Sequence, residues 1–380
     1  MPAVPYWRLA SFYFCFFAIL GGLVPYWSPY LQYRGFSAAE IGELVAILHA
    51  TKIIAPNLWG WLADRSGRGM LVVRLAALGA MVSFAGVLLG DGYWWMALVM
   101  ATYSFFWNAA LPQFEANTMN HLGRADHLYS RVRLWGSVGF IVAVIGLGEA
   151  IDRWGLTVLP PGLLLIFAGL FLAGVVSPEK RYVLGGEAPA PFLRVLCRPP
   201  VLLFFLVCFL LQASHGPYYA FFSIYLQDHQ YSATAIGLLW SVGVVAEIGV
   251  FLLIHRWLPR YGPRRLMTAA LLLAALRWLL IATAVGSLPL LIFAQTLHAA
   301  SFGVYHAVGI YMVNRLFVGA NQGRGQALYS SLTFGAGVAL GSLLAGYGWE
   351  ALGGAQTFLL AALLAAGAGA VARWGLPRTV

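Results

Sequence analysis

Apolar residues fill this chain in long blocks, and short polar stretches separate one block from the next. A block of about 20 apolar residues lets an α-helix cross the hydrocarbon core of a bilayer. The pattern therefore predicts an all-α membrane protein with twelve transmembrane helices. The predicted spans lie near residues 8–31, 39–63, 70–90, 93–120, 131–150, 160–177, 200–226, 234–256, 266–286, 288–315, 326–347 and 355–374.

Short stretches of the chain occur twice, roughly 195 to 200 positions apart, which is about half its length. A duplicated apolar chain is typical of membrane transporters built from two parallel repeats. Glycines punctuate the fifth predicted span of each half, where small residues let helix backbones approach closely. The repeated stretches are Tyr30-Leu31-Gln32 with Tyr225-Leu226-Gln227, Ser37-Ala38 with Ser232-Ala233, Leu128-Tyr129-Ser130 with Leu328-Tyr329-Ser330, and Gly67 with Gly262.

The longest polar interval, 178–199, is rich in proline and basic residues and divides the predicted spans into two groups of six. We interpret it as a cytoplasmic linker between two six-helix bundles. The predicted bundles are residues 1–177 and 200–380.

Composition supports a lipid environment and removes one class of function. Of the 380 residues, 61% are hydrophobic and 9% are charged, whereas about 25% are charged in a soluble domain. The net charge of +10 would suggest nucleic-acid binding in a soluble protein, but 17 of the 23 Lys and Arg residues fall in alternate connections and at the termini. This is the positive-inside distribution, and it predicts that both termini are cytoplasmic. We therefore expect a lipid bilayer and no nucleic acid as a partner.

The connection between the second and third spans reads GWLADRSGRG. It resembles the signature loop of the major facilitator superfamily, and its second-half counterpart, WLPRYGPRRL, has Arg260 where the aspartate would stand. The resemblance implies two six-helix bundles that alternately open a central cavity to either side of the membrane. It also implies a conformational loop made of Gly60, Asp64, Arg65, Gly67 and Arg68.

A closer resemblance lies in polar residues within the spans, and it points to the lactose permease-like proton symporters. It is carried by Glu115-Ala116, by Arg133 in SRVRLWGSVGF, by His298 in QTLHAASF, and by Glu247 and Arg277. The block from Leu211 to Glu247 is most similar to the phenylpropionate permease branch. By this resemblance Glu115 and Arg133 bind substrate, and Glu247, Arg277 and His298 couple transport to protons.

The chain departs from that group at two positions. Ser301 stands where the sugar permease has a proton-carrying glutamate, and Gln295 stands in place of a lysine. Proton coupling would therefore have to use Glu247, Glu115 or His298.

Charges deep in a span are costly and usually have a partner and a purpose. Counting along the helices places Glu247 and Arg277 in the middle third of the membrane, so we expect them to pair across a water-filled cavity. A carboxylate that alternates between an arginine and an apolar environment can bind a proton on one side and release it on the other. The alternative is a static ion pair that fixes helix register.

Lys52 also lies well inside a predicted span, and a cation in the cavity would suit an anionic substrate. Its alternative is a structural pair with Glu43 or another acid. By counting alone, Glu115 and Arg133 would form a salt bridge near the cytoplasmic rim. The sequence thus leaves open whether Lys52 binds an anion or pairs with an acid, and whether Glu115 and Arg133 bind substrate or form a rim salt bridge.

Aromatic residues are dense in the first and seventh spans, and Tyr26 and Tyr219 are candidates to contact an aromatic substrate;. Core packing and interfacial belts would explain most of these aromatics as well. His215 is a further substrate-site candidate, although a buried histidine more often forms part of a hydrogen-bonded core.

Together these features predict a secondary transporter that imports a small organic acid, such as 3-phenylpropionate, by proton symport across a bacterial-type inner membrane. A sugar or nucleoside proton symporter is the first alternative, and a non-transporting sensor on a transporter fold is a remote one. An enzyme is not expected, because HExxH, GxSxG and Walker motifs are absent from the sequence;. We expect no metal, no cofactor and a monomer, with a small-molecule substrate and protons as partners.

Overall fold

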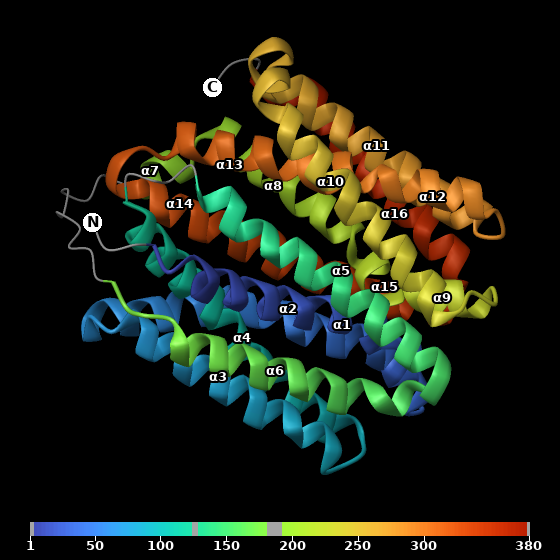
Figure 1. The fold of residues 1–380 in the computed structure, drawn as a ribbon. Helices are drawn as coiled ribbons and strands as arrows, with labels where there is room; N and C mark the ends of the chain where they lie inside the picture. The colour runs from blue at the N-terminus through green and yellow to red at the C-terminus, as the bar shows by residue number, and fades with distance from the viewer. Residues whose placement is uncertain (1–3, 124–127, 181–191, 378–380) are drawn as a thin grey trace. The chain divides into compact units, whose positions relative to one another are not determined.

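The computed structural model describes residues 4–123, 128–180 and 192–377, which are almost entirely helical (Figure 1). The chain divides into two compact units. The first unit consists of Met1–Phe36, Ile47–Leu184 and Ser232–Leu238, and the second of Ser37–Ala46, Gly185–Tyr231 and Leu239–Val380. Each unit therefore includes the first residues of a helix from the other half of the sequence, namely Ser232–Leu238 in the first unit and Ser37–Ala46 in the second. Residues 181–191 of the predicted linker lie outside the described residues.

The described residues of the first half of the sequence form six long helices. They are α1 (Tyr6–Tyr33), α2 (Ala38–Ser66), α3 (Gly69–Ala85), α4 (Tyr93–Leu122), α5 (Tyr129–Trp154) and α6 (Leu159–Val176), with short 3₁₀ turns η1 (Gly86–Leu88) and η3 (Leu156–Val158). Within the first unit, α1 packs against α5 and α6, and α3 packs against α4 and α6.

The described residues of the second half form six long helical segments, which we call rods. Three of the rods are divided into shorter helices by a break or by a π-helical segment. Its elements are α7 (Phe192–Leu196), α8 (Pro199–Ser214), α9 (Gly216–Asp228), α10 (Ala233–Tyr261), α11 (Pro263–Ala284), α12 (Leu288–Thr296), η4 (Ala299–Val304), α13 (Tyr305–Leu316), η5 (Gly319–Asn321), α14 (Gln322–Tyr329), η6 (Ser330–Gly337), α15 (Val338–Leu352) and α16 (Gly354–Gly375). The pairings repeat those of the first half, since the α8–α9 rod packs against η6, α15 and α16, and α11 packs against α12, α13 and α16.

Ten of the described helices or helical rods are long and apolar enough to cross a membrane. The other two long helices are α2 and α4, which carry Lys52 and Glu115 respectively. Polar residues lower the mean hydropathy of these two helices, so hydropathy alone does not identify them as membrane spans. The architecture is that of an all-α, multi-pass membrane protein.

The serines of the sequence repeat have the same structural role at the start of the second helix of each half. Ser37 and Glu40 form a reciprocal capping box, in which the Glu40 carboxylate accepts from the Ser37 N–H at 2.8 Å and the Ser37 hydroxyl accepts from the Glu40 N–H at 3.3 Å;. Ser232 accepts from the Ala235 N–H at 3.2 Å in the corresponding place before α10. The repeated serines are therefore helix N-caps.

Turns with positive φ also recur at the spacing of the sequence repeat. Gly35 has φ of 87° and Gln230 has φ of 65° at equivalent places, and Gly67 and Gly262 have φ of 61° and 76°. Glycine adopts this conformation without steric cost, whereas Gln230 is the one non-glycine residue in it among the described residues;. The duplication thus extends from sequence to backbone conformation.

Glycine also permits close helix contacts in each unit. A Cβ atom at Gly139 on α5 would overlap the Phe14 backbone of α1, and a Cβ at Gly341 on α15 would overlap the Ala213 backbone of α8. Close backbone approach at these two positions confirms the packing expected for the glycine-rich fifth spans. Gly146, in contrast, has no neighbouring atom within 4 Å of such a Cβ.

Carboxylates also cap two helix starts within the units. In the first unit, Asp152 of α5 accepts from the backbone N–H groups of Ala233 and Thr234 at 2.8 and 2.9 Å. In the second unit, Glu350 of α15 accepts from the Ala39 N–H at 3.2 Å. An acid near the end of the fifth long helix of each half therefore satisfies amides that have no intrahelical partner.

Candidate functional site

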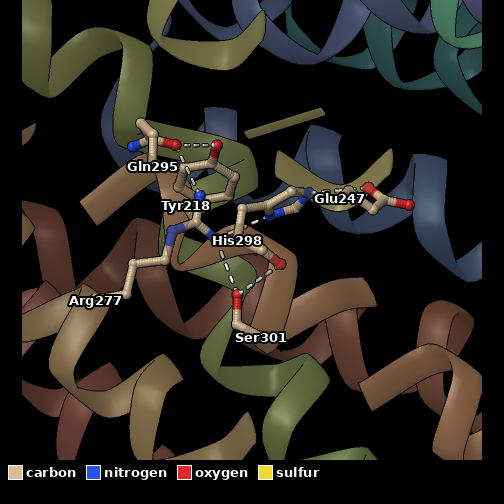
Figure 2. A network of polar contacts seen from close by, with 6 residues as sticks. All are labelled: Tyr218, Glu247, Arg277, Gln295, His298 and Ser301. Atoms are coloured by element: carbon tan, nitrogen blue, oxygen red, sulfur yellow. Dashed lines mark hydrogen bonds and ion pairs between the residues drawn. The ribbon is translucent and has the colours of Figure 1, made fainter. Parts of the chain in front are cut away.

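Six polar side chains of the second unit form one connected cluster (Figure 2). They are Tyr218 of α9, Glu247 of α10, Arg277 of α11, Gln295 of α12, His298 at the start of η4, and Ser301 within η4. Arg277, Gln295 and Ser301 are fully buried. Because η4 is a π-helical segment, it changes the direction of the side chains along the α12–α13 rod, and such segments are frequent at functional sites;.

Arg277 is held by neutral groups. Its Nη1 donates to His298 Nδ1 at 3.0 Å and to Ser301 Oγ at 3.3 Å, and its Nη2 donates to Gln295 Oε1 at 2.9 Å. The Tyr218 hydroxyl donates to the same Gln295 oxygen at 2.9 Å. The guanidinium carbon lies 4.0 Å from the centroid of the Tyr218 ring, within cation–π range;. Among the described residues of this unit, no carboxylate forms an ion pair with Arg277.

His298 lies between Arg277 and Glu247 (Figure 2). Arginine can only donate, so His298 Nδ1 must accept and the ring proton of the neutral histidine must sit on Nε2. His298 Nε2 lies 3.5 Å from Glu247 Oε2, and the Glu247 side chain is 17% exposed. The predicted pair of Glu247 and Arg277 is therefore connected through the histidine.

A second cluster lies in the first unit and involves α1, α4 and α5. Arg133 Nε and Glu115 Oε1 are 4.0 Å apart, with side chains 31% and 38% exposed. The Tyr129 hydroxyl donates to Glu115 Oε1 at 3.2 Å. The Arg133 guanidinium carbon lies 3.8 Å from the centroid of the Phe17 ring. The structure thus brings the two sequence-predicted residues together as a loose, half-buried pair on an aromatic surface.

Lys52 is half-buried on the part of α2 that belongs to the first unit. Among the described residues of this unit, no acid forms an ion pair with its ammonium group. The alternative partner Glu43 accepts instead from the Tyr347 hydroxyl at 2.5 Å. Next to Lys52, Thr51 contacts Ser104 and Asn108 of α4 at 2.9 Å each, which fixes this level of α2 against α4.

Three other candidates occupy different environments. Tyr26 is fully buried, and its hydroxyl lies 2.6 Å from the Val144 carbonyl, to which it donates, and 3.0 Å from the Ala233 carbonyl, so it supports packing. His215 is fully buried at the break between α8 and α9, with Nδ1 2.8 Å from the Leu211 carbonyl. Tyr219 is half-buried and stacks on His215 with a ring-centroid distance of 5.8 Å. A substrate role for these three stays a prediction.

The predicted conformational loop is shorter than expected from the sequence. Helix α2 continues to Ser66, so Gly60, Asp64 and Arg65 lie in its last turns rather than in a connection. Gly67 makes the turn and Arg68 directly precedes α3. Asp64, Arg65 and Arg68 are exposed. Their conformational role stays a prediction.

Sequence reasoning did not select as site residues five side chains that the structure places in the clusters: Phe17, Tyr129, Tyr218, Gln295 and Ser301. Gln295 could have been found, because it is an amide within an apolar run, and such a group needs a buried partner. The aromatic residues had no distinguishing signal, since many other aromatics occur in the same spans.

Other features do not add a site of a different kind. A recess of about 370 Å³ in the first unit is lined by Arg34 and Asp91 among others, and none of the predicted site residues lines it. No group of three or more His, Cys, Asp or Glu side chains in the described part of the chain is arranged to hold a metal ion.

Comparison with known proteins gives consistent relatives over nearly the whole chain. A probable 3-phenylpropionic acid transporter of Escherichia coli (strain K12) is 31% identical over 365 residues, covering 91% of each chain. A maltose permease of Geobacillus stearothermophilus is 29% identical over 350 residues, covering 88% of this chain and 86% of its own. The crystal structure of the nucleoside transporter NupG has a TM-score of 0.83 at 20% identity, covering 96% of this chain and 98% of its own, and shows the shared fold.

The MFS_1 like family matches residues 6–360, and the relatives are permeases and transporters. The chain is a multi-pass membrane transporter, not an enzyme, and it belongs to the MFS_1 like family of the major facilitator fold.

Proposed function

We propose that this protein imports a small aromatic carboxylate, such as 3-phenylpropionate, together with protons across a bacterial inner membrane. The observation that carries this proposal is the buried series Arg277–His298–Glu247, in which a titratable carboxylate is connected to a fixed cation through one histidine. Charges at membrane depth mark ion and substrate pathways. The protein acts as a monomer with both termini in the cytoplasm, by alternating access.

Glu247 is the proton carrier in this proposal, and His298 positions it. Protonation of His298 would place a second N–H on Nδ1, directly opposite the Arg277 donor at 3.0 Å;. The carboxylate has no such conflict, since it can gain a proton while His298 keeps its bond to Arg277. A proton bound by Glu247 on one side of the membrane is released on the other when the surroundings of the carboxylate change.

The anionic, aromatic nature of the substrate is supported by the first unit. Among the predicted substrate-site residues of this unit, Lys52 and Arg133 are cations and Glu115 is the one carboxylate, and the Phe17 ring lies beside Arg133. The relative that is named as a probable 3-phenylpropionic acid transporter points to the same class of substrate. Aromatic walls and a surplus cation suit an aryl carboxylate.

A sugar or nucleoside proton symporter is the second candidate. The half-buried Glu115–Arg133 pair favours it, because a carboxylate beside an arginine offers both an acceptor and donors for hydroxyl groups;. The maltose permease among the relatives favours it too.

Uptake into proteoliposomes tests both candidates. Labelled 3-phenylpropionate, maltose and a nucleoside are supplied in turn, with and without an inward proton gradient. We expect the carboxylate alone to accumulate, and only with the gradient. Accumulation of maltose or the nucleoside in its place would transfer the assignment to the second candidate.

The proton carrier is tested by Glu247→Gln, with Glu149→Gln as the matched control. Glu149 forms an exposed pair with Arg153 on α5, so its change leaves transport at the wild-type level;. Glu247→Gln is expected to reduce accumulation to the external concentration while exchange of substrate across the membrane continues. Uphill transport by this variant would exclude Glu247 as the carrier.

A further inference from the structure

The Arg277 guanidinium is a fully buried cation whose hydrogen-bond acceptors carry no charge. Every acceptor of the Arg277 guanidinium in the described part of this unit is neutral, namely His298 Nδ1, Ser301 Oγ and Gln295 Oε1. A fully buried cation with neutral acceptors is expensive unless a negative charge lies nearby. Within the cluster that charge is Glu247, reached through His298.

Two further donors of the cluster are left over. Arg277 Nε and Gln295 Nε2 are buried and have no hydrogen-bond partner among the described residues. A buried donor whose hydrogen bond is not made destabilises the state that leaves it unpaired. Both are donors, so the ligand atoms that would satisfy them are acceptors, and a carboxylate offers acceptors only.

We propose that the Arg277 cluster binds the carboxylate of the substrate when Glu247 takes up a proton, so that proton and monoanion cross the membrane as a neutral pair. This inference rests on the proposed function and adds the site of the substrate anion and the stoichiometry of one proton to one carboxylate. The bond that forms is Glu247 O–H, and its proton comes from the aqueous side to which Glu247 is open. Neutralisation of Glu247 leaves Arg277 uncompensated, and the incoming anion restores the balance.

The groups around Glu247 are consistent with this exchange. His298 faces it from η4, Arg277 lies beyond His298 on α11, and Tyr219 of α9 interacts with it electrostatically. His215, directly before α9, is fully buried and its ring stacks on that of Tyr219 with a centroid distance of 5.8 Å. Arg277 is therefore the one fixed charge among these groups. The substrate carboxylate can accept from Arg277 Nε and Gln295 Nε2, so the three neutral acceptors of the guanidinium stay in place;.

The driving force separates this mechanism from symport of a neutral solute. A membrane potential of about 100 mV, negative inside, is worth roughly 50-fold accumulation for a solute that enters with one net positive charge. A neutral pair gains nothing from that potential. Proteoliposomes containing the wild-type protein are given either a proton gradient at zero potential or a potential at equal pH, and uptake of labelled 3-phenylpropionate is followed.

We expect accumulation of about 10-fold per pH unit with the gradient, and none with the potential alone. Accumulation driven by the potential would overturn the neutral pair while leaving proton symport of the carboxylate intact. Failure to take up the carboxylate under either condition would overturn the proposed function itself. The two failures are thus distinguishable in one experiment.

Gln295→Glu tests the position of the anion site. A carboxylate fixed 2.9 Å from Arg277 Nη2 would compensate the cation permanently and compete with the substrate. We expect at least a tenfold loss of 3-phenylpropionate binding, measured by its stabilisation of the purified protein against heat, with the unliganded protein still folded. Gln295→Met removes the same amide without adding charge, and a much smaller loss is expected. Equal losses in the two variants would overturn the assignment of the anion to this cluster.

Discussion

The two units differ in the exposure and the partners of the charged side chains within their helices. In the first unit, Glu115 and Arg133 form a loose pair at 4.0 Å, both about one-third exposed and both on uninterrupted helices. In the second, Arg277 is fully buried, bonded to three neutral acceptors, and faces a rod interrupted by the π-helical segment η4. The same six-helix pattern thus carries a partly exposed ion pair in one copy and a buried cation with neutral acceptors in the other.

We propose that the charged clusters of the two halves have different tasks in transport. A half-exposed pair can rearrange around a ligand at little cost, because water replaces the contacts that it loses. A buried cation fixed by three hydrogen bonds cannot rearrange freely, so a change in charge at Glu247 must be answered by another charge. Both copies share the same helix packing, and the π-helical segment η4 of the second copy determines the directions of the His298 and Ser301 side chains;.

The sharpest test of the comparison exchanges each arginine for glutamine. Truncating a buried, hydrogen-bonded charge costs about 2–5 kcal/mol, so we expect Arg277→Gln to reduce uptake by at least about 30-fold. Arg133→Gln is expected to raise the substrate KM by about tenfold, because its interactions are partly exposed. Initial rates in proteoliposomes, with thermal unfolding as a control for folding, measure both. Comparable losses from the two variants would remove the contrast between the units.

Lys52→Met tests whether a cation of the first unit contributes to the affinity for an anionic substrate. Methionine keeps much of the length of the side chain but loses its charge, so the KM for a carboxylate is expected to rise about tenfold while kcat changes little. Uptake as a function of substrate concentration gives both constants. An unchanged KM would remove Lys52 from the argument for an anionic substrate and strengthen the case for a sugar or nucleoside.

Phe17→Leu probes the aromatic surface beneath Arg133. A desolvated cation–π contact is worth up to about 2 kcal/mol and an exposed one about 0.5–1, so we expect a three- to tenfold rise in KM for an aryl carboxylate. The effect on an aliphatic carboxylate of similar size should be smaller. Competition between the two substrates measures the ratio, and an equal effect on both would mean that Phe17 only positions Arg133.

Asp152→Asn is expected to have the smallest effect. Asp152 accepts from two backbone amides at the start of α10, and a lost helix cap costs about 1 kcal/mol;. Since asparagine can still accept one of these bonds, we expect a fall of only a few degrees in the midpoint of thermal unfolding. Glu149→Gln, on the exposed face of the same helix, is the control and should leave the midpoint unchanged.

Much of the molecule could be predicted from the sequence because membrane depth imposes a one-dimensional pattern. Apolar blocks predicted the helices, and the duplicated serines and glycines correspond to helix caps and positive-φ turns, as Ser37, Ser232, Gly67 and Gly262 illustrate. These features depend on local backbone chemistry and on the need to satisfy every polar backbone group within the bilayer. The family resemblance is confirmed by the match over residues 6–360.

Only the tertiary structure decided which polar groups meet. Glu247 and Arg277 were expected to pair, but the turn of η4 places His298 between them, and Gln295 and Ser301 complete the surroundings of the guanidinium. The direction of a side chain on a helix depends on irregularities such as π-segments, and these arise from packing between helices rather than from local propensity. The sequence by itself therefore determined the helices, their duplication and the charged residues, whereas the contacts among those charges followed from packing in three dimensions.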